Sequence, residues 1–131
     1  MTREMGLTPC NGSLKILVKQ RDGLVCVPLD CVEYVSYRDR VLTFVLSGGR
    51  EVRSRSLKEP FAKVVEAVLS GKQFVRPHES YVVNMNYANA MTATDFEMRS
   101  GVRVPISKRV YQRIREAYVQ YVVDGDATRI V

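Results

Sequence analysis

The chain has 131 residues, a length typical of a single domain. Hydrophobic residues make up 46% and charged residues 26%, which is typical of a globular protein and argues against intrinsic disorder. The 20 lysines and arginines outnumber 14 acidic residues, and the net charge of +6 favours polyanions as partners. No apolar run approaches the roughly 18–20 residues of a membrane span, and residues 1–13 lack the hydrophobic region of a signal peptide. We therefore expect a cytoplasmic protein without a membrane partner.

The first part of the chain predicts antiparallel hairpins. Apolar and polar residues alternate in short runs rich in Val, Tyr and Phe, and polar or glycine-containing turns separate these runs. The predicted strands are residues 14–19, 24–27, 31–37, 41–46 and 51–54.

The apolar period then changes from two to three and four, which predicts a helix over residues 57–69 that packs on the sheet. Ser56 and Glu59 match a capping box, and Gly71 is placed to end the helix. Pro60 is tolerated only in or next to the first turn, so the helix can begin a few residues later.

Strands resume in the second half, with a turn around Asn86 and Asn89, and Ser107 is placed to cap a final helix that reaches Tyr121. The fold class is therefore mainly β with short helices, a β-rich α+β domain. We expect a flexible N-terminal segment at 1–13, one folded domain at 14–122 and a C-terminal tail at 123–131. The predicted strands of this half are residues 73–76, 81–83, 91–94, 96–99 and 102–105.

Residues for catalysis are scarce. His78 is the single histidine, so any catalytic triad would have to include it. No hydrolase, zinc-protease or phosphate-loop motif is present. The three cysteines lack C-x-x-C spacing, and we expect reduced thiols rather than a metal site or disulfides. We expect no enzyme activity, no metal, no cofactor and no small-molecule substrate.

Basic residues cluster in two stretches. Six lysines and arginines and no acidic residue lie between Arg99 and Arg115. A second group includes Arg38 and Arg40, in a loop between two predicted strands. Cations on such a loop can reach a DNA groove while their neighbours bind phosphates. The alternative is that these cations are solvated faces of strands and helices, and charge alone does not decide between the two.

The most specific stretch is residues 74–84, FVRPHESYVVN. Taken alone, His78 and Asn84 would more often be structural than ligand-binding, and Asn84 is placed to bond the backbone of the following turn. The stretch resembles the F-x-R-x-H-x-S-Y-x-V-N signature of the LytTR family of bacterial DNA-binding domains. Similar blocks at residues 30–35, 56–59 and 101–109 extend the resemblance over most of the chain.

The resemblance implies antiparallel sheets with short helices, whose inter-strand loops insert into the major groove. It implies a sequence-specific transcription regulator of the response-regulator family. The implied partner is double-stranded DNA, which we expect to carry paired repeats. The resemblance is also compatible with a homodimer bound to this DNA. Many members carry an N-terminal receiver domain, for which about a dozen residues are too few. We therefore expect a stand-alone regulator or an excised domain.

Family contacts are carried over where positions match. Arg40 is the first candidate for base contact and Arg38 the second, since arginine pairs bidentately with guanine. Glu79 occupies a position that is often basic or amide-bearing in the family; its carboxylate can accept from cytosine but is repelled by phosphates. The base-contacting candidates are Arg38, Arg40, Glu79, Ser107 and Lys108; the phosphate-contacting candidates are Arg76, Arg109 and Arg113; the structural motif residues are His78, Ser80 and Asn84.

Two other functions are compatible with the sequence. Glu79 and the missing receiver domain favour a LytTR-like module that modulates another regulator through protein contacts without binding DNA. An RNA-binding module is a third hypothesis, but no aromatic RNA-binding motif supports it.

Overall fold

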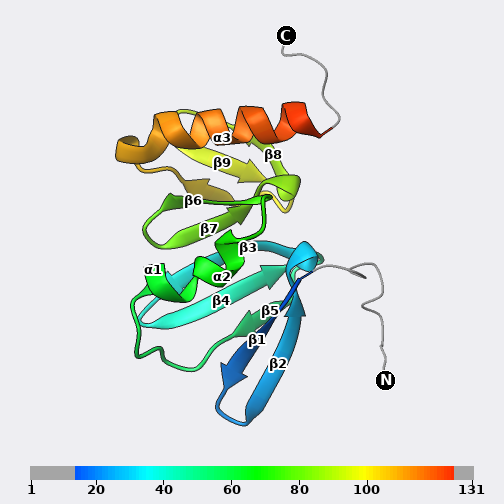
Figure 1. Ribbon diagram of the computed structural model, residues 1–131, viewed down its shortest axis with the longest axis vertical. Coiled ribbons are helices and arrows are strands. Elements are labelled where there is room, and N and C mark those ends of the chain that lie inside the picture. Colours follow the sequence, from blue (N-terminus) through cyan, green and yellow to red (C-terminus); the bar gives the residue numbers. More distant parts are fainter. Residues whose placement is uncertain (1–13, 126–131) are drawn as a thin grey trace.

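The computed structural model describes residues 14–125 (Figure 1). Within that range the chain is dominated by antiparallel strands, and the prediction of a β-rich fold is confirmed. The strands are β1 (Lys15–Gln20), β2 (Gly23–Pro28), β3 (Val32–Arg38), β4 (Val41–Leu46), β5 (Glu51–Arg53), β6 (Phe74–His78), β7 (Tyr81–Asn84), β8 (Ala88–Met91), β9 (Asp95–Met98) and β10 (Arg103–Pro105). The α-helices are α1 (Phe61–Val64), α2 (Glu66–Leu69) and α3 (Tyr111–Asp124).

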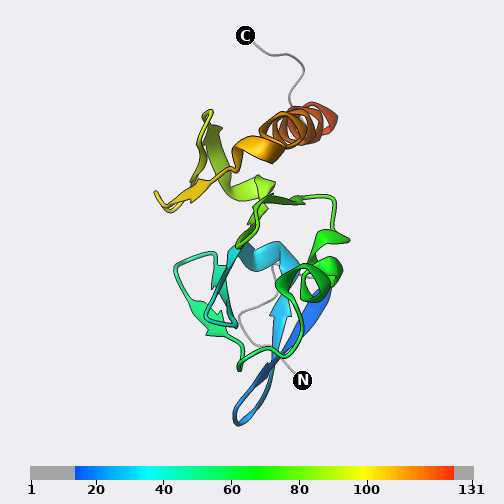
Figure 2. The ribbon, with the colours of Figure 1, turned by 90° about the vertical axis from the view of Figure 1, so that its left-hand side faces the viewer.

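The strands form three sheets. The central five-stranded sheet has the order β5-β4-β3-β7-β6, in which β3 pairs with β7 across a long stretch of sequence. Strands β1 and β2 form a separate hairpin, and β10-β9-β8 form a three-stranded sheet. Figures 1 and 2 show the β8–β10 sheet and α3 at one end of the molecule and the β1–β2 hairpin at the other.

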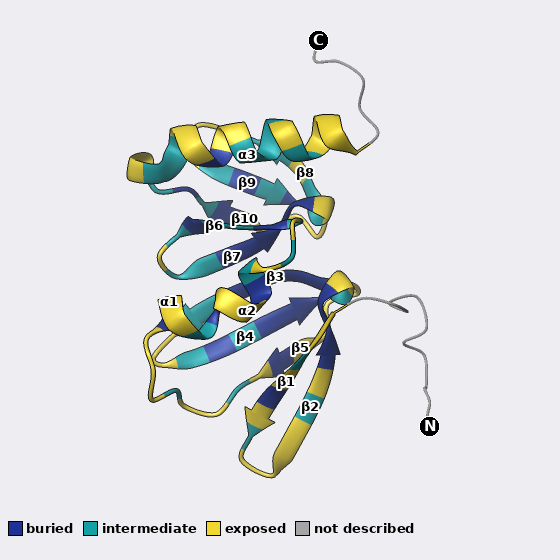
Figure 3. Ribbon diagram, viewed as in Figure 1, coloured by how far each residue is buried: buried dark blue, intermediate teal, exposed yellow. Residues whose placement is uncertain are grey.

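The central sheet separates two hydrophobic cores. Successive side chains of β7 point to opposite faces of the central sheet, so Val82 contributes to one core and Val83 to the other. Phe44 and Phe61 belong to the first core, which includes residues of the β1–β2 hairpin. Ile114 of α3 belongs to the second core, which includes β9 and β10. Figure 3 shows the resulting contrast between buried strands and the exposed tip of the β1–β2 hairpin.

The predicted helix at 57–69 begins later than expected and is divided. Pro60 is the N-cap of α1, no side chain caps that helix, and the capping box of Ser56 and Glu59 is therefore wrong. Val65, with φ −83° and ψ −2°, separates α1 from α2. The apolar period is nevertheless used as predicted, because Phe61 and Val68 face the first core.

Two further expectations need correction. The strand predicted at 91–94 lies earlier, at Ala88–Met91, and residues 92–94 form a turn. Ser107 begins a short 3-10 segment, Lys108–Val110, and its side chain makes no capping hydrogen bond. Helix α3 follows and extends to Asp124, into the range expected as a tail.

One of the two described cysteines differs from expectation. Cys26 is a free, exposed thiol on β2. Cys31 is disulfide-bonded, which corrects the expectation of reduced thiols for this residue. Cys10, the expected N-terminal segment 1–13 and the tail beyond residue 125 lie outside the described residues. No helix within residues 14–125 combines the length and apolar character needed to span a bilayer.

Candidate nucleic-acid interface

The β3–β4 turn carries the first two candidate residues. Arg38 pairs with Val41, which leaves Asp39 and Arg40 as the central residues of a two-residue turn. Both have positive φ, 52° for Asp39 and 67° for Arg40. This is the backbone pattern of a type I′ hairpin turn, which matches the twist of the strands and usually selects Asn, Asp or Gly. Arg38, Asp39 and Arg40 are all exposed.

Main-chain hydrogen bonds hold this turn on both sides. The amide of Leu57 donates to the carbonyl of Arg40, with an N···O distance of 2.7 Å. On the β3 side, the amide of Tyr37 donates to the carbonyl of Ser80 at 2.9 Å. The turn is thus fixed between the segment that follows β5 and the β6–β7 turn.

The β6–β7 turn presents Glu79. His78 and Tyr81 are paired across it, so Glu79 and Ser80 form the connection. The guanidinium of Arg76 donates through Nη2 to the carbonyl of Glu79 at 2.9 Å, and it lies over the Phe61 ring at 5.0 Å. Nε of Arg76 is buried without a hydrogen-bond partner. This arginine therefore orders the backbone that carries the exposed Glu79 carboxylate.

His78 and Ser80 also contribute to the order of this turn. The backbone amide of Ser80 donates to Nδ1 of His78 at 3.1 Å, so that the imidazole closes the turn. The His78 ring meets Tyr81 edge to face, with ring centroids 5.7 Å apart. Because Nδ1 accepts a hydrogen bond, the proton of the neutral ring is assigned to Nε2.

Asn84 lies at the end of β7 and is fully buried. Its Nδ2 donates to the carbonyl of Val32 on β3 at 2.9 Å, and its Oδ1 accepts from the amide of Asn86 at 3.0 Å. The side chain joins two elements and does not reach the surface.

The third candidate segment connects β10 to α3. The amide of Ser107 donates to the carbonyl of Pro77 on β6 at 2.8 Å, which holds this segment against the β6–β7 hairpin. Ser107 is half-buried, whereas Lys108, Arg109 and Arg113 are exposed. The start of α3 is therefore fixed beside the residues that precede Glu79.

The β6–β7 turn and the β10–α3 segment together enclose a hollow of about 350 Å³. Three arginines face a single carboxylate there, so the hollow is positively charged. Lys108 does not belong to this set. The lining residues are Arg76, His78, Glu79, Ser107, Arg109, Val110 and Arg113.

The β3–β4 turn, the β6–β7 turn and the β10–α3 segment lie along one edge of the molecule, which we call the loop edge. It is the left edge of Figure 1, and Figure 2 looks directly onto it. Two of the main-chain hydrogen bonds, Tyr37 to Ser80 and Ser107 to Pro77, join its three segments in series. The exposed candidate residues from three distant parts of the sequence are thus brought onto one surface.

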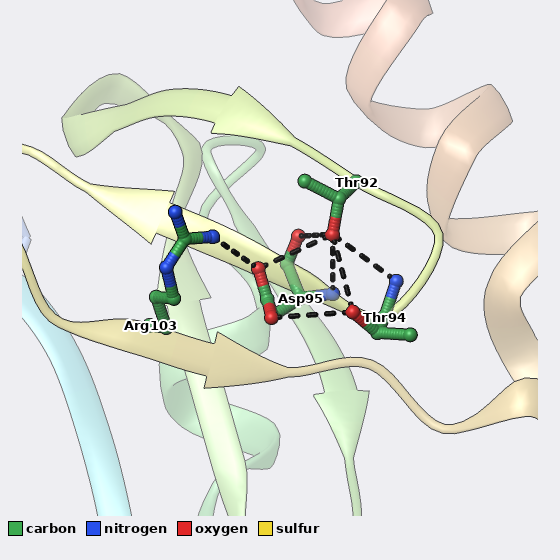
Figure 4. A network of polar contacts seen from close by, with 4 residues as sticks. All are labelled: Thr92, Thr94, Asp95 and Arg103. Atoms are coloured by element: carbon green, nitrogen blue, oxygen red, sulfur yellow. Dashed lines mark hydrogen bonds and ion pairs between the residues drawn. The ribbon is translucent and has the colours of Figure 1, made fainter.

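Two arginines of the basic stretch 99–115 have structural roles. Arg103 forms an ion pair with Asp95 at 2.9 Å, within the network of Figure 4. Thr92 is also part of this network, and its hydroxyl accepts from the Asp95 amide at 3.0 Å. Arg99 donates to the carbonyl of Asn86 at 2.8 Å. The guanidinium groups of Arg99 and Arg103 are thus engaged within the domain.

Sequence reasoning did not identify the stacking that supports the loop edge. The rings of Tyr37 and Phe61 stack with centroids 4.9 Å apart, and Arg76 covers Phe61. The sequence places Phe61 only within the predicted helix 57–69, as one of its periodic apolar residues. An aromatic residue and an arginine at unrelated positions give no sequence signal of such contact.

Comparison with known proteins places the chain among DNA-binding domains. The family model of the LytTr DNA-binding domain matches residues 22–118. Among solved structures, the chain is similar to the LytTr DNA-binding domain of a Bacillus cereus protein described as a methyl-accepting/DNA response regulator. The two share 25% sequence identity and superimpose with a TM-score of 0.63, over 81% of this chain and 97% of the other. Comparison with curated proteins gives no significant match.

Proposed function

Because the chain belongs to the family of LytTr DNA-binding domains, we propose that it is a sequence-specific transcription regulator that inserts the turns of the loop edge into the major groove. DNA is the partner of this family of domains. The geometry of the loop edge supports the assignment of some residues to bases and of others to phosphates.

The observation that carries the proposal is the joining of three exposed segments by backbone hydrogen bonds. A surface that is ordered before binding loses less conformational entropy when it binds. The bonds from Tyr37 to Ser80 and from Ser107 to Pro77 fix the spacing of the segments without using their exposed side chains. These side chains are therefore free to contact an extended ligand that runs along the whole loop edge.

We assign base contacts to the β3–β4 turn and to Glu79. Arg40 and Arg38 carry bidentate donors suited to guanine, and the Glu79 carboxylate can accept from cytosine N4. On the β10–α3 segment, Ser107 and Lys108 are the further candidates for base contact. Such contacts specify sequence, whereas contacts to phosphates determine the position of the protein on the duplex.

We assign the phosphate contacts to Arg109 and Arg113 in the first instance. Both are exposed and line the positively charged hollow. Arg76 lines the same hollow, but its guanidinium already donates to the Glu79 carbonyl and covers Phe61. We therefore propose that Arg76 acts chiefly by positioning Glu79.

The proposed functional unit is the domain at 14–122, acting in the cytoplasm on double-stranded DNA with paired repeats. If two copies bind as a homodimer, their half-sites should be separated by about 10–10.5 base pairs or a multiple of it, because the same groove must face each copy.

One observation favours the alternative function, a module that modulates another regulator by protein contact. Leu17 and Leu24 on the β1–β2 hairpin are 62% and 61% exposed, and exposed apolar side chains grouped on one element are typical of protein-binding surfaces. They lie on the hairpin, away from the loop edge.

Binding measurements on random and promoter duplexes, repeated over a range of salt concentrations, distinguish the two functions. The proposed regulator should bind specific DNA with roughly 10³-fold or greater preference over random DNA, and its affinity should fall as salt rises. Absence of DNA affinity at low salt, together with a stable complex with another regulator, would support the alternative and overturn the proposal.

A further inference from the structure

We infer that the segment 54–58, between β5 and α1, is a fourth DNA-binding element, in which Arg55 and Lys58 hold backbone phosphates beside the inserted β3–β4 turn. The inference rests on the proposed function, since it assumes that this turn enters the groove. It adds an element that lies outside the three segments of the loop edge.

The segment continues along the outer side of β4 up to the turn. The amide of Ser54 donates to the carbonyl of Leu42 at 2.9 Å, and the Leu42 amide donates back to Oγ of Ser54 at 3.0 Å. Further along, the amide of Leu57 donates to the carbonyl of Arg40. The backbone of the segment is thus in contact with the residue that is the first candidate for base contact.

A second anchor fixes the other side of the segment. The amide of Arg55 donates to the carbonyl of Lys19 on β1 at 2.9 Å. The segment is therefore held between β1 and β4 by main-chain bonds, while its cationic side chains project from it. Arg55 and Lys58 are exposed, and within residues 14–125 neither side chain makes a hydrogen bond or an ion pair.

The nearby carboxylates do not neutralise these cations. Glu59 forms an ion pair with Lys63 at 3.3 Å, and Glu51 lies 3.6 Å from Arg53. In the turn itself, Asp39 opposes Arg38 and Arg40. The turn and the segment 54–58 therefore carry four cations against one unpaired carboxylate.

The dimensions of DNA agree with phosphate contacts. The major groove is about 12 Å wide, so a turn centred in it has a phosphate backbone roughly 6 Å away on each side. Paired strands lie about 4.8 Å apart, and Leu57 is hydrogen-bonded to Arg40 as a neighbouring strand would be. Lys58 follows Leu57 directly, which brings its side chain to the groove rim when Arg40 faces the bases.

The test measures the affinity of the full chain for its selected DNA site and for random DNA, as a function of salt. The variants are Arg55→Ala, Lys58→Ala and the double variant. The matched control is Lys72→Ala, an exposed lysine in the connection between α2 and β6, outside the loop edge and the segment 54–58. Circular dichroism checks that each variant is folded.

Each alanine substitution should weaken binding about five- to tenfold near 0.1 M salt, equally for specific and random DNA. It should also reduce by about 0.9 the steepness with which the logarithm of the binding constant falls with the logarithm of the salt concentration. The double variant with Arg55→Lys and Lys58→Arg preserves both charges and should keep the affinity and the salt dependence of the wild-type chain. Lys72→Ala should change neither the affinity nor the salt dependence.

Two results overturn the inference, and they differ in what else they affect. If the wild-type chain binds specific DNA and the double alanine variant keeps its affinity and slope, the inference is wrong and the proposed function stands. If the wild-type chain has no preference for any DNA sequence, the proposed function fails and the inference falls with it.

Discussion

Arg40 combines a candidate functional side chain with an unfavourable backbone. Its φ of 67° is in the left-handed region, where a side chain costs roughly 1–2 kcal/mol. Glycine is the residue preferred at such a position of a type I′ turn. A strained residue retained at an exposed turn agrees with a role for its side chain in binding.

Replacing Arg40 by glycine should therefore separate stability from binding. Arg40→Gly should raise the free energy of unfolding by up to about 1 kcal/mol, because the strain is relieved, while Arg40→Ala should give no such gain. Both variants should lose base preference by about 1–3 kcal/mol. Urea denaturation and DNA titration measure the two effects, and a glycine variant that keeps full base preference would contradict the assignment.

Glu79 carries a negative charge on a surface that we propose binds a polyanion. It is exposed in a hollow that also contains Arg109 and Arg113. Glu79→Gln should increase affinity for random DNA severalfold, because a repulsive charge is removed near the phosphates. It should also shift one base preference towards adenine, the usual partner of glutamine. Unchanged affinity together with unchanged preference would mean that Glu79 does not face DNA.

At the residue level, the signature in residues 74–84 selected candidate positions but did not predict the contacts of their side chains. Arg76 was expected to contact phosphate, but its guanidinium donates to the Glu79 carbonyl. The partner of a long side chain depends on which elements pack beside it. Here that element is α1, which brings Phe61 under the guanidinium.

At the level of elements, strands with alternating residues were predicted well, because half-buried strands impose a period of two. The strand expected at 91–94 was wrong for a local reason. The Thr92 hydroxyl accepts from the amides of Thr94 and Asp95, at 3.2 and 3.0 Å, and so closes a turn (Figure 4). Threonine favours strands on average, but its hydroxyl can instead satisfy turn amides.

One buried side-chain amide, that of Asn84, adds a hydrogen bond to the pairing of β7 with β3. Asn84→Ala should lower the free energy of unfolding by roughly 2–3 kcal/mol, because it removes a buried side chain's hydrogen bonds to the Val32 carbonyl and from the Asn86 amide. Asn89→Ala, an exposed control on β8, should stay within about 0.5 kcal/mol of wild type. Chemical denaturation measures both, and equal stability of the two variants would refute this role.

For the whole molecule, sequence reasoning predicted the class of fold but not the two cores. The pairing of β3 with β7 joins Tyr34 to Val83, and no local pattern indicates a contact over such a separation. The loop edge could not be predicted from local patterns either. The hydrogen bonds that join its segments are between backbone atoms, and residue type does not indicate them. The resemblance to a family supplied what the local patterns lacked.

Burial of tyrosines predicts how the stability of the whole domain depends on pH. Burial is the first cause that raises the pKa values of Tyr34, Tyr118 and Tyr121 above the usual 10.0. A raised folded-state pKa stabilises the fold below the unfolded pKa, and this contribution is lost as pH rises through the folded value. The free energy of unfolding should therefore fall above about pH 10.

Denaturation at pH 7 to 11 tests this dependence. Tyr118→Phe should reduce the alkaline loss, because phenylalanine does not ionise, even though the variant loses the hydrogen bond to the Ala88 carbonyl. A wild-type free energy of unfolding that is constant up to pH 11 would contradict the expected linkage.

The central claim is that the loop edge reads DNA sequence, and selection of bound duplexes from a random pool tests it most directly. The wild-type chain should enrich one motif, and Arg40→Ala should lose preference at one or two positions while still binding DNA through its phosphate contacts. If the wild-type chain enriches no motif, or if Arg40→Ala enriches the same motif equally well, the account of this surface is contradicted.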